Sequence, residues 1–296
     1  MLPTFVAQTS NTEPILIIVF FGLFALVANW IVYIKGFFRL QPLPYDLRKW
    51  SLIQCVMCLG IYLTSAIFLA PFLFHFILKI VSTAHLSLFT TETSRLILLQ
   101  TINISVDIIL LSLYLAFQKK GSVLAIWKDP QMQKHSSYFY DILIGFFTWF
   151  ISFPLIVAIN SLCELINHLL FQWEEVDQVA VKFLKLSASS FFTVMISILM
   201  IILAAPCIEE FIFRGSLQNW LRRHLGSKAA IVITSIVFAM MHYAPSQSKS
   251  NFPLIVSLFT FSLYLGFLYE KTRSLLAPIV LHMTFNTISV IRILVN

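Results

Sequence analysis

The sequence predicts an all-α fold, a polytopic transmembrane helix bundle with about eight spans. Only 11% of the 296 residues are charged, against about 25% in soluble domains, and 59% are hydrophobic. The mean hydropathy is +0.88. Apolar runs long enough to cross a hydrocarbon core, which takes about 20 residues, recur along most of the chain. These observations exclude an ordinary soluble enzyme.

Eight stretches have the length and composition of a membrane span. In chain order they are 14–34, 51–80, 96–117, 139–170, 186–213, 228–244, 251–269 and 274–294. The first is expected to remain as an anchor, because the thirteen residues before it hold no Lys or Arg and so lack the basic region of a signal peptide. The fourth is the least regular: Asp141, Asn160 and Glu164, with Pro154, predict a kink or a partly interfacial position.

Loop charges and tryptophans predict how the chain lies in its membrane. If the N-terminus faces outward, fourteen of the twenty cations fall on inner loops, the asymmetry of the positive-inside rule. Both termini are therefore expected on the outside of an integral multi-pass protein of a plasma (inner) membrane. Tryptophans near helix ends predict interfacial anchors, since an indole there buries its ring and keeps its N–H hydrated. These are Trp30, Trp50, Trp127, Trp173 and Trp220.

A group of ionisable residues marks the C-terminal third. Residues 1–180 are expected to form about four transmembrane helices without an assigned function, and residues 181–296 a catalytic core. In the core, Glu209, Glu210 and Arg214 follow a long apolar run, although such a group costs about 2.5–3.5 kcal/mol at mid-bilayer. Helical spacing puts Glu210 and Arg214 on one face, where they can pair. Glu209 points about 100° away and needs another partner.

Two later helices each carry a short polar stripe. His242 follows Phe238 by four residues, and Asn286 follows His282 by four, so each pair shares one face of its helix. In a helix bundle these faces can meet the carboxylates in a common interior.

Residue counts place Glu209 and His242 at one depth. With a turn at Gly226 and Ser227, Glu209 lies 17 residues before Gly226 and His242 lies 15 residues after Ser227. Both are then about 23–26 Å from the turn along antiparallel helices. Pro206, three residues before Glu209, lacks a backbone donor and is expected to loosen the helix one turn earlier.

These motifs resemble those of a known family. APCIEEFIFRG, FAMMH and HMTFN match the patterns EExxxR, FxxxH and HxxxN of the CAAX protease and bacteriocin-processing family of intramembrane endopeptidases, the CPBP or Abi family. Its type II CAAX prenyl endopeptidases remove the last three residues of prenylated proteins. The resemblance covers roughly residues 186–290, and it implies that the Glu210–Arg214 pair is structural.

The resemblance also implies catalytic roles. Glu209 would activate water with the help of His242, and His282 and Asn286 would stabilise the oxyanion. The chemistry agrees, because a carboxylate in an apolar environment becomes a workable general base near neutral pH. Imidazole and amide groups can supply donors where the tetrahedral intermediate develops charge.

The need for a metal is left open by the residues. HExxH is absent, and the preferred mechanism requires no cofactor. The alternative is Zn²⁺ held by Glu209, His242 and His282, as in sites with two histidines and one glutamate.

Two other functions are alternatives to proteolysis. One is a non-catalytic family member that acts as a membrane binding or immunity scaffold. The other is a proton-coupled transporter, which is disfavoured because carriers usually show repeated halves, whereas these polar groups lie in one half. The scattered basic residues do not form a nucleic-acid stripe. The expected partners are membrane lipid and a membrane-associated peptide or protein; prenylated CAAX ends, bacteriocin leaders and other membrane peptides all fit.

Overall fold

The computed structural model describes residues 12–40, 50–84, 89, 91–128, 137–172 and 176–295. Within these ranges the regular secondary structure is helical, with turns and short connections between helices and one isolated bridge between Lys128 and Ser274. The all-α prediction is confirmed. The α-helices are α1 (Thr12–Ile34), α2 (Leu52–Thr64), α3 (Ala70–Thr83), α4 (Glu92–Ala116), α5 (Lys120–Trp127), α6 (Tyr138–Phe171), α7 (Val179–Ser187), α8 (Phe191–Leu199), α9 (Ala205–Glu210), α10 (Asn219–Met240), α11 (Asn251–Thr272) and α12 (Leu276–Val295).

Short segments of other helical geometry join several of these helices. Three are π-helical: η1 (Ser65–Leu69), η2 (Met200–Ala204) and η3 (Phe211–Gln218). The fourth, η4 (Pro245–Ser250), is a 3₁₀ segment. Two of the π-helical segments flank α9, which carries the paired glutamates, and π-helical turns are frequent at functional sites.

Seven helical segments of the described residues are long and apolar enough to cross a membrane. The fifth, Phe191–Met240, consists of two helical parts that meet at a sharp kink at Gly226, where φ is 79° and ψ is 166°. Glycine reaches this conformation without the steric cost that a side chain would add. Divided at Gly226, the segments number about eight, as predicted, and the predicted hairpin turn is confirmed there.

The fourth span is not interfacial, which was one of the two alternatives predicted for it. It is one continuous helix of 34 residues, α6, with Pro154 inside it. Its polar residues Asp141, Asn160 and Glu164 are buried in the protein rather than placed at an interface. Pairing explains this, since Lys128 Nζ lies 2.7 Å from Asp141 Oδ2 and Ser257 donates to Asn160 over 3.1 Å. The irregular composition thus marks a central helix.

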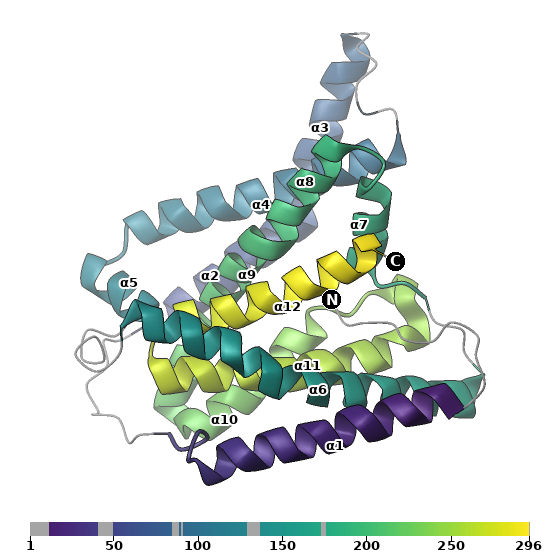
Figure 1. Ribbon diagram of the computed structural model, residues 1–296. Coiled ribbons are helices and arrows are strands. Elements are labelled where there is room, and N and C mark those ends of the chain that lie inside the picture. Colours follow the sequence, from purple (N-terminus) through teal and green to yellow (C-terminus); the bar gives the residue numbers. More distant parts are fainter. Residues whose placement is uncertain are drawn as a thin grey trace.

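Helix α6 lies side by side with α1, α11 and α12 (Figure 1). A Cβ atom on Gly145 would lie 2.5 Å from the Ala277 carbonyl, so glycine permits this close approach of α6 and α12. Figure 1 also shows α3 extending beyond the other helices.

Tryptophan positions agree with the prediction only in part. Trp30 and Trp127 are 64% and 42% exposed. Trp50, predicted as an interfacial anchor, is instead 1% exposed, and its Nε1 donates to Ser216 Oγ over 2.8 Å. Its indole N–H finds a protein partner in η3 and needs no water. Trp173 lies outside the described residues.

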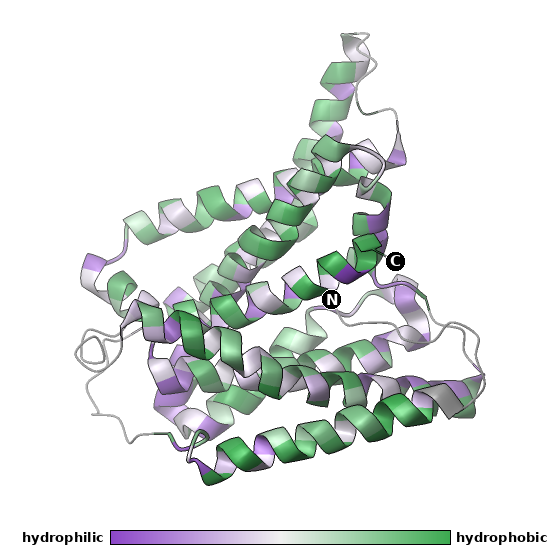
Figure 2. Cartoon of the chain, viewed as in Figure 1, coloured by the Kyte–Doolittle hydropathy of each residue, from purple (hydrophilic) through white to green (hydrophobic). Residues whose placement is uncertain are grey.

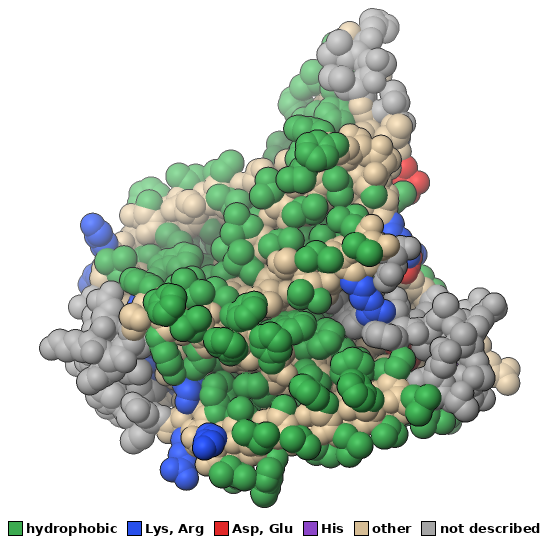
Figure 3. Space-filling model, viewed as in Figure 1, with side chains coloured by type: hydrophobic (Ala, Val, Ile, Leu, Met, Phe, Trp, Pro, Cys, Tyr) green, Lys and Arg blue, Asp and Glu red, His purple; other side chains and the backbone are tan. Residues whose placement is uncertain are grey.

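The surface has the character of a membrane protein. Figure 2 shows hydrophobic residues along most of α1, and Figure 3 shows apolar side chains over the flank of the bundle. Lys and Arg side chains gather mainly at one end (Figure 3), where α1, α4 and α11 end and α6 and α12 begin (Figure 1). Alternate loops therefore meet at one basic end, as the charge pattern predicts. Which end faces the cytoplasm stays a prediction.

Candidate active site

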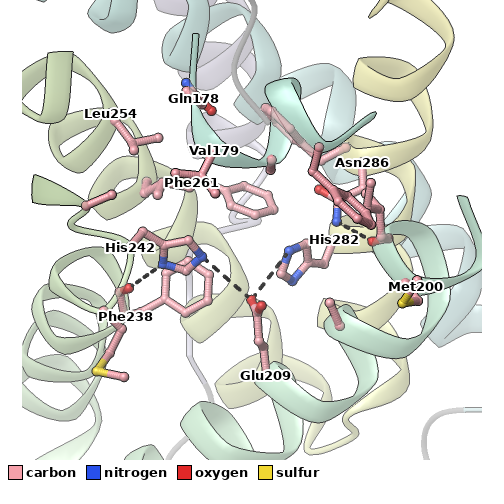
Figure 4. A pocket seen from close by; sticks show the side chains of 18 of the residues that line it. Gln178, Val179, Met200, Glu209, Phe238, His242, Leu254, Phe261, His282 and Asn286 are labelled. Carbon is pink, nitrogen blue, oxygen red and sulfur yellow. Dashed lines mark hydrogen bonds and ion pairs between the residues drawn. The ribbon is translucent and has the colours of Figure 1, made fainter. Parts of the chain in front are cut away.

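Three helical elements bring four of the predicted site residues to one cavity of about 400 Å³. Glu209 projects from α9, His242 lies just beyond α10, and His282 and Asn286 project from α12 (Figure 4). The remaining wall is mostly apolar, with Leu254, Phe261 and other hydrophobic side chains. The prediction that Glu209 and His242 lie at one depth, made from residue counts along the Gly226 hairpin, is therefore confirmed.

The Glu210–Arg214 pair lies directly behind the cavity wall. Arg214 Nη1 donates to Glu210 Oε1 over 3.0 Å, and both side chains are fully buried. Arg214 Nη2 also donates to Ser262 Oγ over 2.6 Å. The predicted i,i+4 contact is thus present, and α11 provides a further acceptor that the sequence did not point to.

Glu209 carries a buried oxygen that faces the two histidines. Its Oε2 is buried and has no hydrogen-bond partner among the described residues. The Nε2 atoms of His282 and His242 lie 3.9 and 4.0 Å from this oxygen. These separations are too long for direct hydrogen bonds. They suit a small molecule such as water, which would sit about 2.8 Å from each group.

Both histidines are oriented through their Nδ1 atoms. His242 Nδ1 lies 2.8 Å from the Phe238 carbonyl oxygen, and His282 Nδ1 lies 2.8 Å from Glu210 Oε1. Each partner is an acceptor, so Nδ1 carries the proton in a neutral ring and Nε2 presents its lone pair to Glu209. Glu210 thereby holds both Arg214 and His282, which links the ion pair to the cavity.

Asn286 is positioned by a break in the hydrogen bonding of the segment Phe191–Met240, which carries Glu209. Its Nδ2 donates to the Ile201 carbonyl over 2.8 Å. In η2 the Ala205 amide bonds to the Met200 carbonyl, so the Ile201 carbonyl would next be paired by residue 206. That residue is Pro206, which has no N–H. The predicted loosening before Glu209 is present, and Asn286 satisfies the freed carbonyl while keeping its second N–H.

A polar ladder holds the segment Phe191–Met240 against α11. Arg214, Gln218 and Arg222 recur every four residues, opposite Ser262, Gly266 and Glu270, which have the same spacing. Gln218 Nε2 donates to the Gly266 carbonyl over 2.9 Å and to Glu270 Oε1 over 3.1 Å.

Glu270 completes the ladder at the end nearest the Gly226 turn. It accepts from Ser227 Oγ over 2.7 Å and lies 2.9 Å from Arg273 Nη2. Sequence reasoning missed these contacts, although the four-residue spacing of polar side chains on an apolar helix was a usable signal.

The part of the chain before residue 181 also contributes to the cavity. Gln100 and Ile104 of α4 line it, together with Gln178 and Val179 at the start of α7. These positions carry no motif, so the sequence predicts no site residue before residue 181. The division into 1–180 and 181–296 stays a prediction, but the wall of the cavity draws on both parts.

The side chains do not form a ready metal centre. In the part of the chain that the structure describes, no group of three or more His, Cys, Asp or Glu residues has the arrangement needed to hold a metal ion. Glu209, His242 and His282 converge, but with atom separations of 3.9–4.0 Å around one carboxylate oxygen. The zinc alternative therefore fits poorly, and no step below depends on a metal.

Comparison with known proteins supports the family resemblance. Residues 191–288 match the family model described as type II CAAX prenyl endopeptidase Rce1-like. The segment contains all six predicted site residues, and the resemblance is confirmed over this third of the chain. No curated protein and no solved structure matches the chain. The family match and the apolar helices together support a membrane-embedded, protease-like protein.

Proposed function

We propose that the protein is an intramembrane endopeptidase that hydrolyses a peptide bond of a membrane-associated substrate with water activated by Glu209. The observation that carries this proposal is the buried, unpartnered Oε2 of Glu209, which faces two imidazole nitrogens across a cavity. An unpaired buried carboxylate oxygen is costly to a fold. Such a group in a cavity is suited to proton abstraction.

In the proposed reaction, Glu209 takes a proton from the bound water as the water oxygen attacks the scissile carbonyl carbon. A C–O bond forms, and the carbonyl oxygen becomes an oxyanion. The proton then passes from Glu209 to the amide nitrogen, the C–N bond breaks, and a carboxylic acid and an amine leave. His242 Nε2 accepts a hydrogen bond from the water and orients it, since its Nδ1 is committed to Phe238.

Asn286 is the donor that we assign to the oxyanion. Its second Nδ2–H is left for the cavity, because one N–H is held by the Ile201 carbonyl. His282 serves the oxyanion when its Nε2 carries a proton, and Glu210 Oε1, 2.8 Å from Nδ1, holds the ring in place for this role. Glu210 and Arg214 are positioning residues, since they act through His282.

The substrate class follows from the family description and not from the cavity alone. The matching family model is named for CAAX prenyl endopeptidases, so prenylated peptide termini are the first candidates. An apolar wall of Leu254, Leu258 and Phe261 beside Glu209 agrees with a hydrophobic peptide. Bacteriocin leaders and other membrane peptides are tested alongside.

The test is release of peptides from a pool of membrane-anchored peptides, with and without a farnesyl group, by purified protein. Glu209→Gln keeps the shape of the side chain but loses the base, so release should fall by about 10²- to 10⁴-fold. Glu164→Gln is the matched control, because Glu164 is also a buried intramembrane glutamate but does not line the cavity. Equal release by wild type and Glu209→Gln would refute the assignment. Binding without any release would identify a non-catalytic scaffold.

A further inference from the structure

A buried glutamine in the loop between α10 and α11 has no role in the proposed chemistry. Gln247 lies in η4, five residues after His242, and is only 2% exposed. It lines the same cavity as Glu209. Its Oε1 is buried and, among the described residues, has no hydrogen-bond donor. A buried acceptor without a donor is rare in proteins and calls for a ligand or another explanation.

The loop around Gln247 is held firmly by side chains. Asn251 pairs with Ala244 through both amide atoms, over 3.0 and 2.8 Å, and also donates to the Ser248 carbonyl over 2.8 Å. Asn167 of α6 donates to the Lys249 carbonyl over 3.0 Å. These bonds fix the loop on both sides of Gln247.

Ser248, next to Gln247, has an unusual backbone conformation. Its φ is 45° and its ψ is −120°, a region that residues with a side chain rarely adopt. Such strain persists only where surrounding contacts impose it, and it is concentrated at functional sites. The loop therefore presents Gln247 to the cavity in one defined position, as a binding site requires.

The rest of the lining indicates what Gln247 would bind. The cavity wall includes the amide side chains Gln100, Gln178 and Asn286, and no Lys or Arg stands among its described lining residues. Gln178 lies at the end of the cavity away from Glu209 (Figure 4). Glu209, His242, His282 and Asn286 are assigned to the reaction, which leaves neutral side chains such as Gln100, Gln178 and Gln247 for polar recognition of the rest of the substrate. An amide carries the same donor and acceptor groups as a peptide unit, so it matches a peptide backbone.

We propose that Gln247 is a substrate-binding residue whose Oε1 accepts a hydrogen bond from a backbone N–H of an extended peptide lying in the cavity. This inference rests on the proposed function and specifies how the same site binds its substrate. Recognition through the backbone tolerates varied side chains, while the apolar wall selects for hydrophobic segments.

The proposal makes an unusual prediction for stability. Since Gln247 Oε1 has no partner in the fold, Gln247→Leu should keep or raise the melting temperature while it weakens peptide binding. Gln118→Leu is the matched control. Gln118 Oε1 accepts from Gln54 Nε2 over 2.7 Å and lies outside the cavity lining, so this variant should melt lower and bind normally.

The decisive experiment replaces one backbone N–H at a time by an ester oxygen in the pool of membrane-anchored peptides, farnesylated and not. Affinities are measured in the Glu209→Gln background, which prevents turnover, with and without Gln247→Leu. One ester position should weaken binding by about three- to tenfold, and Gln247→Leu should abolish that difference. Gln247→Met provides a second variant if Gln247→Leu does not fold.

Each contrary result has a definite meaning. Equal affinity for all ester positions, or the same ester effect with and without Gln247, would overturn the inference and leave the proposed hydrolysis standing. A melting temperature lowered as much by Gln247→Leu as by Gln118→Leu would also overturn it, since Gln247 would then be structural. Position-specific binding without peptide release by wild type would retain the inference and refute the hydrolysis. No binding of any peptide in the pool would refute both.

Discussion

Helices α1 and α11 are both apolar, yet they occupy opposite environments. In α1, only 6% of the span is buried in the protein, whereas 72% is buried in the segment Pro245–Thr272, which contains α11. The difference lies in how their polar residues are used: α1 bonds across helices through Asn29, which donates to the Ile151 carbonyl and accepts from Tyr264. On α11, Ser257, Ser262 and Glu270 all bond to other helices. Apolar runs identify the spans of this protein. Polar side chains that hydrogen-bond to several other helices distinguish the spans at the centre of the bundle.

The largest loss of stability is expected where the segment Phe191–Met240 contacts α11. Arg214→Ala leaves the buried Glu210 carboxylate without its ion-pair partner and removes the bond to Ser262, so the free energy of unfolding should fall by about 3–5 kcal/mol. Arg95→Ala is the control, because Arg95 is exposed and its Nε donates to the Phe89 carbonyl over 3.0 Å. Thermal unfolding in detergent measures both, and an unchanged melting temperature for Arg214→Ala would contradict the ladder.

Leucines of the two helices provide a matched pair for packing. Leu265 of α11 is fully buried, and Leu26 of α1 is 69% exposed. Leu265→Ala opens a cavity in the protein and should cost about 2–5 kcal/mol. Leu26→Ala should change stability little, because lipid chains fill the space that it leaves. Equal losses for the two variants would show that α1 is as tightly packed in the membrane as α11.

Glycines of α1 and α11 test how closely each helix is approached by its neighbours, through the addition of a single methyl group. A Cβ atom on Gly266 would lie 2.8 Å from Gln218 Oε1, and the Gln218 side chain cannot move away without breaking its bonds to α11. Gly266→Ala should therefore cost about 1–3 kcal/mol. Gly22 of α1 has nothing within 4 Å of such a Cβ, so Gly22→Ala should be neutral or gain up to about 1 kcal/mol from helix propensity. Chemical unfolding of both variants in mixed micelles would show whether the signs differ.

The sequence predicted those parts of the site that depend on helical spacing. The Glu210–Arg214 contact and the common depth of Glu209 and His242 follow from residue counts, and Gly226 marks the turn that makes the counts meaningful. Pro206 correctly indicated a disturbed helix before the carboxylates.

Contacts between distant segments could not be read in this way. Asn286 reaches the carbonyl that Pro206 leaves free, a pairing that depends on how α12 packs on η2. Trp50 appeared to lie at a helix end near lipid, but its indole N–H is held by Ser216, far along the chain. Gln247 carries no motif, and only its burial beside the cavity distinguishes it from a loop residue.

In the proposed mechanism, Glu209 takes a proton from a water molecule, and the water oxygen attacks the carbonyl carbon of a peptide bond without the help of a metal ion. The most direct test uses a membrane-anchored peptide that the wild type cleaves. Its cleavage is followed in ¹⁸O-labelled water after exhaustive chelation of metal ions. Wild type should cleave at an undiminished rate and place one ¹⁸O atom in each new C-terminal carboxylate, while Glu209→Gln should give almost no labelled product. Two results would contradict metal-free activation of water by Glu209. One is loss of cleavage on chelation with recovery on addition of Zn²⁺, and the other is labelled product from Glu209→Gln at the wild-type rate.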